Sequence, residues 1–179
     1  MTTLEKIRKH FNHYADFRGK WLEKSKYFHS EDLVYFKNLI PKNCSVLEIG
    51  CGNGNLIGNL NVSKAVGIDV SDRSIYEAKK KFPNCNFVCS AVENLDETFK
   101  RSEKFDYIIL SDTIGYFEDI QNNLNLLHNL CTKDTRIVVS YFSALWSPVL
   151  SLALTLNIKM PDLKPPLFSS LDLKTFLAI

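Results

Sequence analysis

The sequence has almost no surplus of charge: its 22 basic and 20 acidic residues leave a formal net charge of +2 over 179 residues. So small a balance gives no argument for nucleic acid or an anionic membrane as a partner. The first ten residues are polar and charged, which predicts that no secretory signal peptide stands there. The apolar stretch from Trp146 to Ile158 is shorter than the ~20 residues of a membrane span, so no transmembrane segment is expected.

Cysteine and histidine are few and lack the spacing of metal or disulfide sites. The five cysteines are scattered and odd in number: Cys44, Cys51, Cys85, Cys89 and Cys131. Such usage is typical of reduced thiols in a cytoplasmic protein. Cys85 and Cys89 have no second pair, and the four histidines are not at zinc-site intervals. We therefore predict a cytoplasmic protein without a metal site.

The stretch that organises the chain is Ser45–Asn55, S-V-L-E-I-G-C-G-N-G-N. A short run of β-prone apolar residues is followed by three alternating glycines, so we expect a strand, a turn and a helix starting near Asn55. Glycine permits positive φ and lacks the Cβ that would block a ligand, and a helix N-terminus offers unpaired N–H groups. We expect a ligand to lie against Gly50, Gly52 and Gly54.

Two acidic residues at strand ends indicate what kind of ligand this is. The glycines do not fit the G-x-G-x-x-G spacing of dinucleotide sites. Glu48 near the end of the first strand would repel a pyrophosphate and suits a ligand that carries an amino group. Asp69 ends a second strand, K-A-V-G-I-D, nineteen residues after Gly50. A carboxylate at that position can accept hydrogen bonds from two ribose hydroxyls.

These motifs resemble those of class I S-adenosylmethionine-dependent methyltransferases. The matching segments are V-L-E-I-G-C-G-N-G, G-I-D-V-S, F-V-C-S-A-V-E-N-L and F-D-Y-I-I-L-S-D, within roughly Tyr14 to Ser143. The resemblance implies a Rossmann-like α/β fold, an open, mostly parallel sheet with helices on both faces, and S-adenosylmethionine as cofactor. We expect one domain, 1–179, made of an N-terminal helical cap (1–44), a cofactor-binding core (45–143) and an apolar helical tail (144–179).

The expected cofactor site lies at the carboxyl ends of the strands, where open α/β sheets bind ligands. The residues expected to bind the cofactor are Tyr14, Glu48, Gly50, Cys51, Gly52, Gly54, Asp69, Val70, Ala91, Val92 and Asp112. The resemblance implies that Tyr14 reaches the methionine carboxylate, although packing on an apolar helix face is an equal alternative. Ala91 stands where the family often has an acidic partner of the adenine amino group. Adenine recognition would then fall to the backbone at Ala91 and Val92, or to Glu93.

The methyl acceptor is not specified by any motif. Transfer from a sulfonium needs positioning and exclusion of water more than a strong base, so the lack of an evident catalytic histidine or cysteine does not count against an enzyme. Asp112, Thr113 and Tyr116 are candidates for positioning the acceptor. The aromatic N-terminal segment and apolar tail favour a small molecule, a lipid-linked compound or a glycan precursor. The alternative is a truncated, inactive module that binds the cofactor or a partner.

The tail departs from the family pattern. Five strands are expected, at 45–49, 64–69, 86–89, 105–110 and 136–141, and nothing remains for the two strands that usually follow. The exposed edge of the strand from Arg136 to Tyr141 invites pairing with another chain, so we expect the chain to form a homodimer, to be prone to aggregation or to be only marginally stable. We expect Trp146–Ile158 to form a helix that packs on the domain or covers the acceptor site; lying on a membrane or partner is the alternative.

Overall fold

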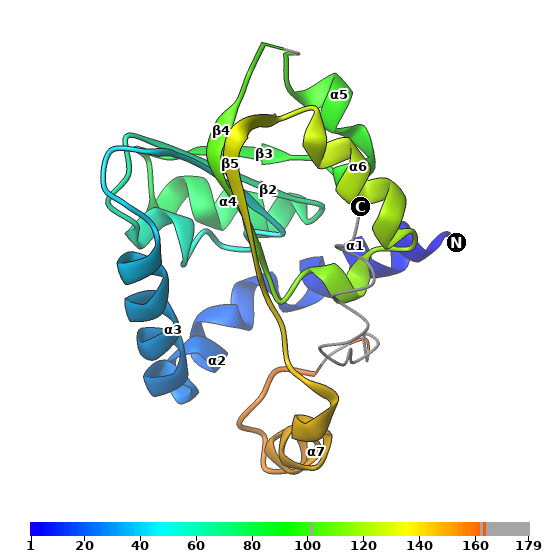
Figure 1. Cartoon of the computed structure of the whole chain (residues 1–179). Helices are drawn as coiled ribbons and strands as arrows, with labels where there is room; N and C mark the ends of the chain where they lie inside the picture. Colours follow the sequence, from blue (N-terminus) through cyan, green and yellow to red (C-terminus); the bar gives the residue numbers. More distant parts are fainter. Residues whose placement is uncertain (101, 162, 164–179) are drawn as a thin grey trace.

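The computed structural model describes residues 1–100, 102–161 and 163. Its described strands form one parallel sheet in the order β3-β2-β1-β4-β5 (Figure 1). They are β1 (Ser45–Ile49), β2 (Lys64–Asp69), β3 (Asn86–Cys89), β4 (Phe105–Ser111) and β5 (Cys131–Ser140). The predicted Rossmann-like sheet of five strands is confirmed. β5 begins earlier than expected, because Cys131 already pairs with Phe105 before a register shift ahead of Tyr107.

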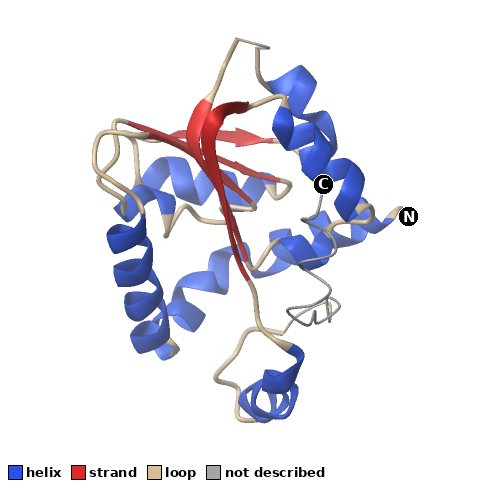
Figure 2. Cartoon of the chain, viewed as in Figure 1, coloured by secondary structure: helices blue, strands red, loops and turns tan. Residues whose placement is uncertain are grey.

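Helices cover both faces of the sheet (Figure 2). They are α1 (Thr3–Tyr14), α2 (Arg18–Lys24), α3 (Lys26–Leu39), α4 (Asp72–Lys81), α5 (Leu95–Thr98), α6 (Ile120–His128) and α7 (Ser147–Thr155). Short 3-10 turns lie at Ala15–Phe17, Ile57–Asn59, Val92–Asn94, Ile114–Tyr116 and Ala144–Trp146. No helix of the described ranges combines the length and hydropathy that crossing a bilayer requires.

The alternation of side chains along β1 separates two hydrophobic cores. Leu47 and Ile49 point to one face, where they pack with residues of α5, α6 and β4. Val46 points to the other, where Phe36 of α3 and Ala78 of α4 cover the sheet. Since alternate residues of a strand share a face, Glu48 belongs to the α3–α4 side, together with Val46. The Glu48 side chain therefore points to the side of the sheet on which the segment after the glycine turn lies.

The connection after the glycine turn differs from expectation. A crossover helix from Asn55 was expected, but the described structure between β1 and β2 holds one 3-10 turn, Ile57–Asn59. The segment is rich in asparagine and glycine, which form helices poorly, and is too short for several turns. Gly58 lets the backbone of this turn pack closely against the Phe82 ring, because a Cβ at residue 58 would lie 2.4 Å from Cγ of Phe82. Between β1 and β2, the described residues therefore do not form the α-helix whose N-terminus the sequence predicted behind the glycine turn.

Candidate functional site

The glycine turn runs over the carboxyl end of β1 in a conformation that few side chains allow. Gly50 and Gly52 have φ values of +73° and +54°, in the left-handed region. A Cβ on Gly50 would lie 2.3 Å from Oγ1 of Thr113, and one on Gly52 would lie 2.9 Å from Cζ of Arg18. The turn therefore needs glycine both for its backbone angles and for the side chains that pass over it.

Asp69, at the end of β2, ties the glycine turn to the next loop. One carboxylate oxygen accepts a hydrogen bond from the Gly52 N–H at 2.8 Å, and the other accepts one from the Ser71 N–H at 2.8 Å. Burial raises the pKa of Asp69, and these two hydrogen bonds oppose that effect. The two backbone donors leave the carboxylate further acceptor positions for a ligand.

Glu48 lies behind the turn. It is 4% exposed, and one of its carboxyl oxygens accepts a hydrogen bond from the Ile57 N–H at 3.0 Å. Burial raises its pKa to about 8, although the bond from Ile57 and the charge of Arg18 lower it. Glu48 thus holds the 3-10 turn of Ile57–Asn59. Its expected contact with the amino group of a ligand stays a prediction.

A cavity of about 710 Å³ lies at the carboxyl ends of the strands. Five of the expected cofactor residues line it: Gly50, Asp69, Val70, Val92 and Asp112. The two other candidates for acceptor positioning, Thr113 and Tyr116, line it as well. One continuous space therefore joins the glycine turn, the Asp69 carboxylate and the end of β4.

A family model described as a methyltransferase domain matches residues 40–161. The chain belongs to this family. The match confirms the resemblance to class I methyltransferases, whose cofactor is S-adenosylmethionine.

Two curated methyltransferases show the range of relatives. Malonyl-[acyl-carrier protein] O-methyltransferase 1 of Ilyobacter polytropus is 26% identical over 145 residues, which make up 77% of this chain and 52% of the relative. A ubiquinone/menaquinone biosynthesis C-methyltransferase of Campylobacter jejuni is 27% identical over 113 residues, 58% of this chain and 47% of the relative. The chain spans about half the length of the curated relatives it matches.

Solved methyltransferases share the fold. A Thermotoga maritima protein described as a possible histamine N-methyltransferase aligns with a TM-score of 0.77 and 20% identity, over 96% of this chain and 79% of that one. Magnesium protoporphyrin IX methyltransferase from Synechocystis, with bound S-adenosylmethionine, aligns with a TM-score of 0.72 and 16% identity, over 99% and 85% of the two chains. At these identities the likeness is one of fold.

The remaining expected residues of the methyltransferase site do not line the cavity: Tyr14, Glu48, Cys51, Gly52, Gly54 and Ala91. Cys51 is 4% exposed, and burial raises the pKa of its thiol, as suits a packing residue. Tyr14 packs its ring against His10 and His13, with centroids 5.0 and 4.8 Å apart. Both the role of Tyr14 toward the cofactor and its packing on an apolar face stay predictions.

Arg18 is the residue at this site that the sequence reasoning missed. It begins α2, lines the cavity and places its guanidinium over Gly52. Among the described residues, neither a hydrogen bond nor an ion pair engages this guanidinium. Its charge nevertheless lowers the pKa of Glu48 and Asp69, after larger effects of burial and hydrogen bonding. An arginine with free donors beside the turn is suited to an anionic group of a ligand.

Glu93 is one of the residues to which we expected adenine recognition to fall. It lines the cavity, and Nδ2 of Asn123 donates a hydrogen bond to its carboxylate at 3.1 Å. Asn123 is 1% exposed, so the donor is fixed within the core. Ala91 is buried next to this group. The structure therefore has a carboxylate held by a hydrogen bond at Glu93, two residues after Ala91, the position where the family often has an acidic residue.

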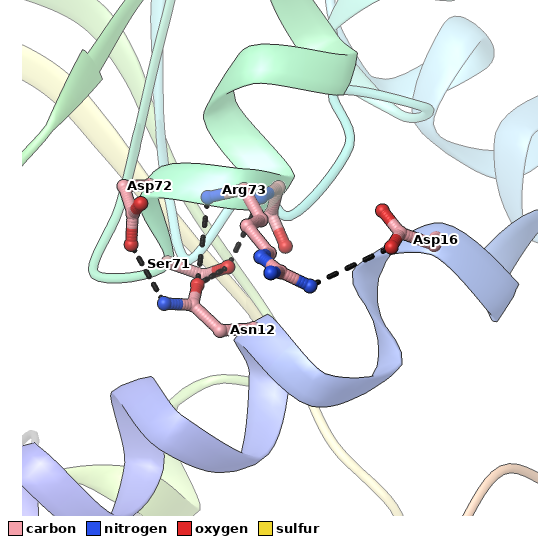
Figure 3. A network of polar contacts seen from close by, with 6 residues as sticks. Asn12, Asp16, Ser71, Asp72 and Arg73 are labelled. Carbon is pink, nitrogen blue, oxygen red and sulfur yellow. Dashed lines mark hydrogen bonds and ion pairs between the residues drawn. The ribbon is translucent and has the colours of Figure 1, made fainter.

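Polar contacts fix α1 across the end of β2 (Figure 3). The Asn12 side chain accepts a hydrogen bond from Oγ of Ser71 at 2.6 Å and donates one to Asp72 at 2.7 Å. Arg73 forms an ion pair with Asp16 at 3.5 Å, just beyond α1. These contacts join α1 to the start of α4 and close one side of the cavity.

The part of the cavity away from the glycine turn is apolar. Its walls come from α1, α2, α3, α7 and neighbouring loops, and include Leu4, Ile7, Phe11, Trp21, Leu22, Phe28, Phe142, Trp146, Val149, Leu150 and Ala153. We call this part the apolar chamber. Phe28 and Phe142 stack with ring centroids 5.6 Å apart. Such walls suit a flat or hydrocarbon-rich molecule.

Proposed function

We propose that the chain binds S-adenosylmethionine at the glycine turn and transfers its methyl group to an apolar small molecule in the apolar chamber. The observation that carries this proposal is the single cavity that joins Gly50 and Asp69 to those aromatic walls. Its volume of about 710 Å³ is in the range of sites for drug-sized ligands and cofactors. The relatives act on chemically different acceptors, so the acceptor is argued from the chamber alone.

Three charged residues would hold the parts of the cofactor. Asp69 would accept hydrogen bonds from the ribose hydroxyls with the positions left free by Gly52 and Ser71. Glu93, held by Asn123, would accept one from the adenine amino group. Arg18 would bind the methionine carboxylate in the place we expected for Tyr14, because charge-assisted hydrogen bonds to a carboxylate are strong.

The chemistry asks the chain to orient the acceptor and keep water out. When bound, the cofactor supplies a methyl group on a positively charged sulfur, which an acceptor atom can displace in line. The apolar chamber would exclude water, and Asp112 and Thr113 would orient the reacting end of the acceptor. If that atom carries a proton, His29 can accept it, because burial and then the charge of Arg18 lower its pKa and favour the neutral imidazole.

Pairing of two copies along β5 is a separate proposal. In the described ranges, β5 pairs with β4 on one side, and its other edge pairs with no strand. An open edge of this kind can add a strand from another chain. Sedimentation velocity tests it: a dimer that a proline at Val138 converts to a monomer would support pairing, and a monomer at all concentrations would exclude it.

Calorimetric titration tests the proposed function. S-adenosylmethionine and S-adenosylhomocysteine should both bind, and NAD should not. Asp69→Asn should weaken the binding of both ligands by about tenfold or more, as expected when hydrogen bonds to a charged group are lost. If a folded chain binds neither ligand, the proposal fails and a partner-binding module becomes the better description.

A second titration tests Arg18. Arg18→Gln should weaken the binding of S-adenosylmethionine by about tenfold or more. The same change should leave the binding of decarboxylated S-adenosylmethionine nearly unchanged, because that ligand lacks the carboxylate. Lys20→Gln, in the same helix, is the matched control. Equal losses for both ligands would show that Arg18 acts on the fold and not on the carboxylate.

A further inference from the structure

The helix α7 has no charged residue and an exposed apolar surface. Between Ser147 and Ile158 the sequence contains no charged residue, and the hydroxyl residues Ser147, Ser151 and Thr155, spaced four apart, share one side. Its inner side lines the apolar chamber, while Leu152 and Leu156 are each 59% exposed and Leu145, just before it, is 89% exposed. Exposed leucines gathered in this way mark an interaction surface. We call Leu145, Leu152 and Leu156 the outer face of α7.

Lysines border this face. The segment 20–26 carries Lys20, Lys24 and Lys26, all exposed, against one acidic residue, Glu23. Nζ of Lys24 donates a hydrogen bond to the carbonyl oxygen of Asn157 at 2.9 Å, which joins α2 to the chain just after α7. Figure 1 shows α7 at one end of the molecule, below α2 and α3. Lys24 therefore lies beside the end of α7, and Lys20 shares its side of α2 because it is four residues earlier. Lys26, in contrast, lines a separate cleft with residues of α4.

We propose that the outer face of α7, together with Lys20 and Lys24, docks on an anionic phospholipid bilayer. Leucines beside lysines are the composition of helices that lie in the membrane interface, with hydrocarbon below and headgroups around the cations. α7 is too short to span the bilayer, so the helix lies along the surface. The local charge of the segment decides this contact, although the net charge of the whole chain is small.

A second copy of the chain fits this surface less well. Two copies related by a two-fold axis bury the same patch on both sides, so the lysines of both copies would be gathered in one interface. Like charges placed together oppose association. Anionic headgroups, in contrast, complement Lys20 and Lys24 at once.

The docked position also connects the bilayer with the apolar chamber. Leu150 and Ala153, which are half-buried and line the chamber, form the inner side of the helix whose outer face touches the membrane. An acceptor dissolved in the bilayer would have an apolar path into the cavity along α7. This consequence for the acceptor rests on the proposed methyl transfer, whereas the docking itself does not.

Vesicle flotation tests the docking with the intact chain. The chain should float with vesicles of phosphatidylcholine mixed with phosphatidylglycerol, more weakly with phosphatidylcholine alone, and less at high salt. Leu152→Glu/Leu156→Glu should reduce the bound fraction about tenfold or more, and Lys20→Gln/Lys24→Gln should remove most of the preference for phosphatidylglycerol. Tyr76→Glu, which changes a residue 66% exposed on α4, should leave flotation unchanged.

Three results would overturn the docking. They are no flotation of the unmodified chain, equal flotation of the double glutamate variant, and a dimer that this variant turns into a monomer without any effect of lipid. Calorimetric binding of S-adenosylmethionine to each variant reports on the fold and the cofactor site separately. Flotation without cofactor binding would contradict the proposed function and leave the docking intact.

Discussion

Replacing Glu48 by glutamine should change how the stability of the chain depends on pH. Burial raises the pKa of this carboxyl from its ordinary value near 4.5 to about 8, so the native state favours the protonated form. The resulting stabilisation is fully present below about pH 4.5 and is lost as the pH rises toward about 8. At about 1.4 kcal/mol for each pH unit, the whole effect is at most roughly 5 kcal/mol, of which about 3 is lost by pH 7.

Glutamine at this position keeps an oxygen that can accept the hydrogen bond from the Ile57 N–H, but it does not titrate. The free energy of unfolding of Glu48→Gln should therefore rise relative to the unmodified chain by a few kcal/mol between about pH 5 and about pH 8. Urea unfolding followed by circular dichroism at both pH values measures this difference. Burial also raises the pKa of Asp69 and Asp32, but both chains share these residues, so their effects cancel.

Identical pH dependence of the two chains would refute the argument. It would mean that Glu48 is ionised in the native state and that the polar groups around it compensate for burial. Binding of S-adenosylmethionine by the same variant adds a second result: a large loss of affinity would support the expected contact between Glu48 and the amino group of the cofactor.

Three further changes test the parts of the site. Gly50→Ala should destabilise the fold by at least about 2 kcal/mol in urea unfolding, because the new Cβ meets Thr113 and the backbone is left-handed; an unchanged midpoint would contradict the tight turn. Asn12→Ala should weaken S-adenosylmethionine about tenfold in calorimetry and expose α1 to limited proteolysis, because the contacts with Ser71 and Asp72 are lost; unchanged cleavage would argue against this anchoring. Glu93→Gln should reduce the preference for S-adenosylhomocysteine over its inosine analogue in competition binding, whereas an unaltered preference would remove Glu93 from adenine recognition.

The central strands and the glycine turn could be predicted from the sequence because their signals are local. Val46, Leu47 and Ile49 are β-prone and apolar, and the glycines that follow have few other uses. The alternation along β1 also predicts the direction of the Glu48 side chain, because Glu48 shares a face of the sheet with Val46 and Leu47 points to the other face. In the structure Glu48 is buried and accepts a hydrogen bond from the Ile57 N–H, and its contact with the cofactor stays a prediction.

The N-terminal cap could be predicted only in outline because its details depend on tertiary contacts. Arg18 follows a helix without any motif, and its place over Gly52 results from how α1 and α2 pack on the core. Ser30, a residue type common at helix N-caps, lies inside α3, which begins at Lys26. Its hydroxyl donates a hydrogen bond to the Tyr27 carbonyl oxygen at 2.7 Å. The apolar and aromatic residues in the segment 20–28 permit α3 to begin before Ser30.

The anchoring of α1 has a consequence for the order of events during synthesis. Asn12 leaves the ribosome early, but the hydroxyl and carboxylate that hold it, on Ser71 and Asp72, follow about sixty residues later. Contacts between residues so far apart in sequence form late, because a long loop must first be closed. The growing chain therefore carries its amphipathic first helix without a docking site until α4 has been made, and a chaperone that shields this helix would assist the nascent protein most at that stage.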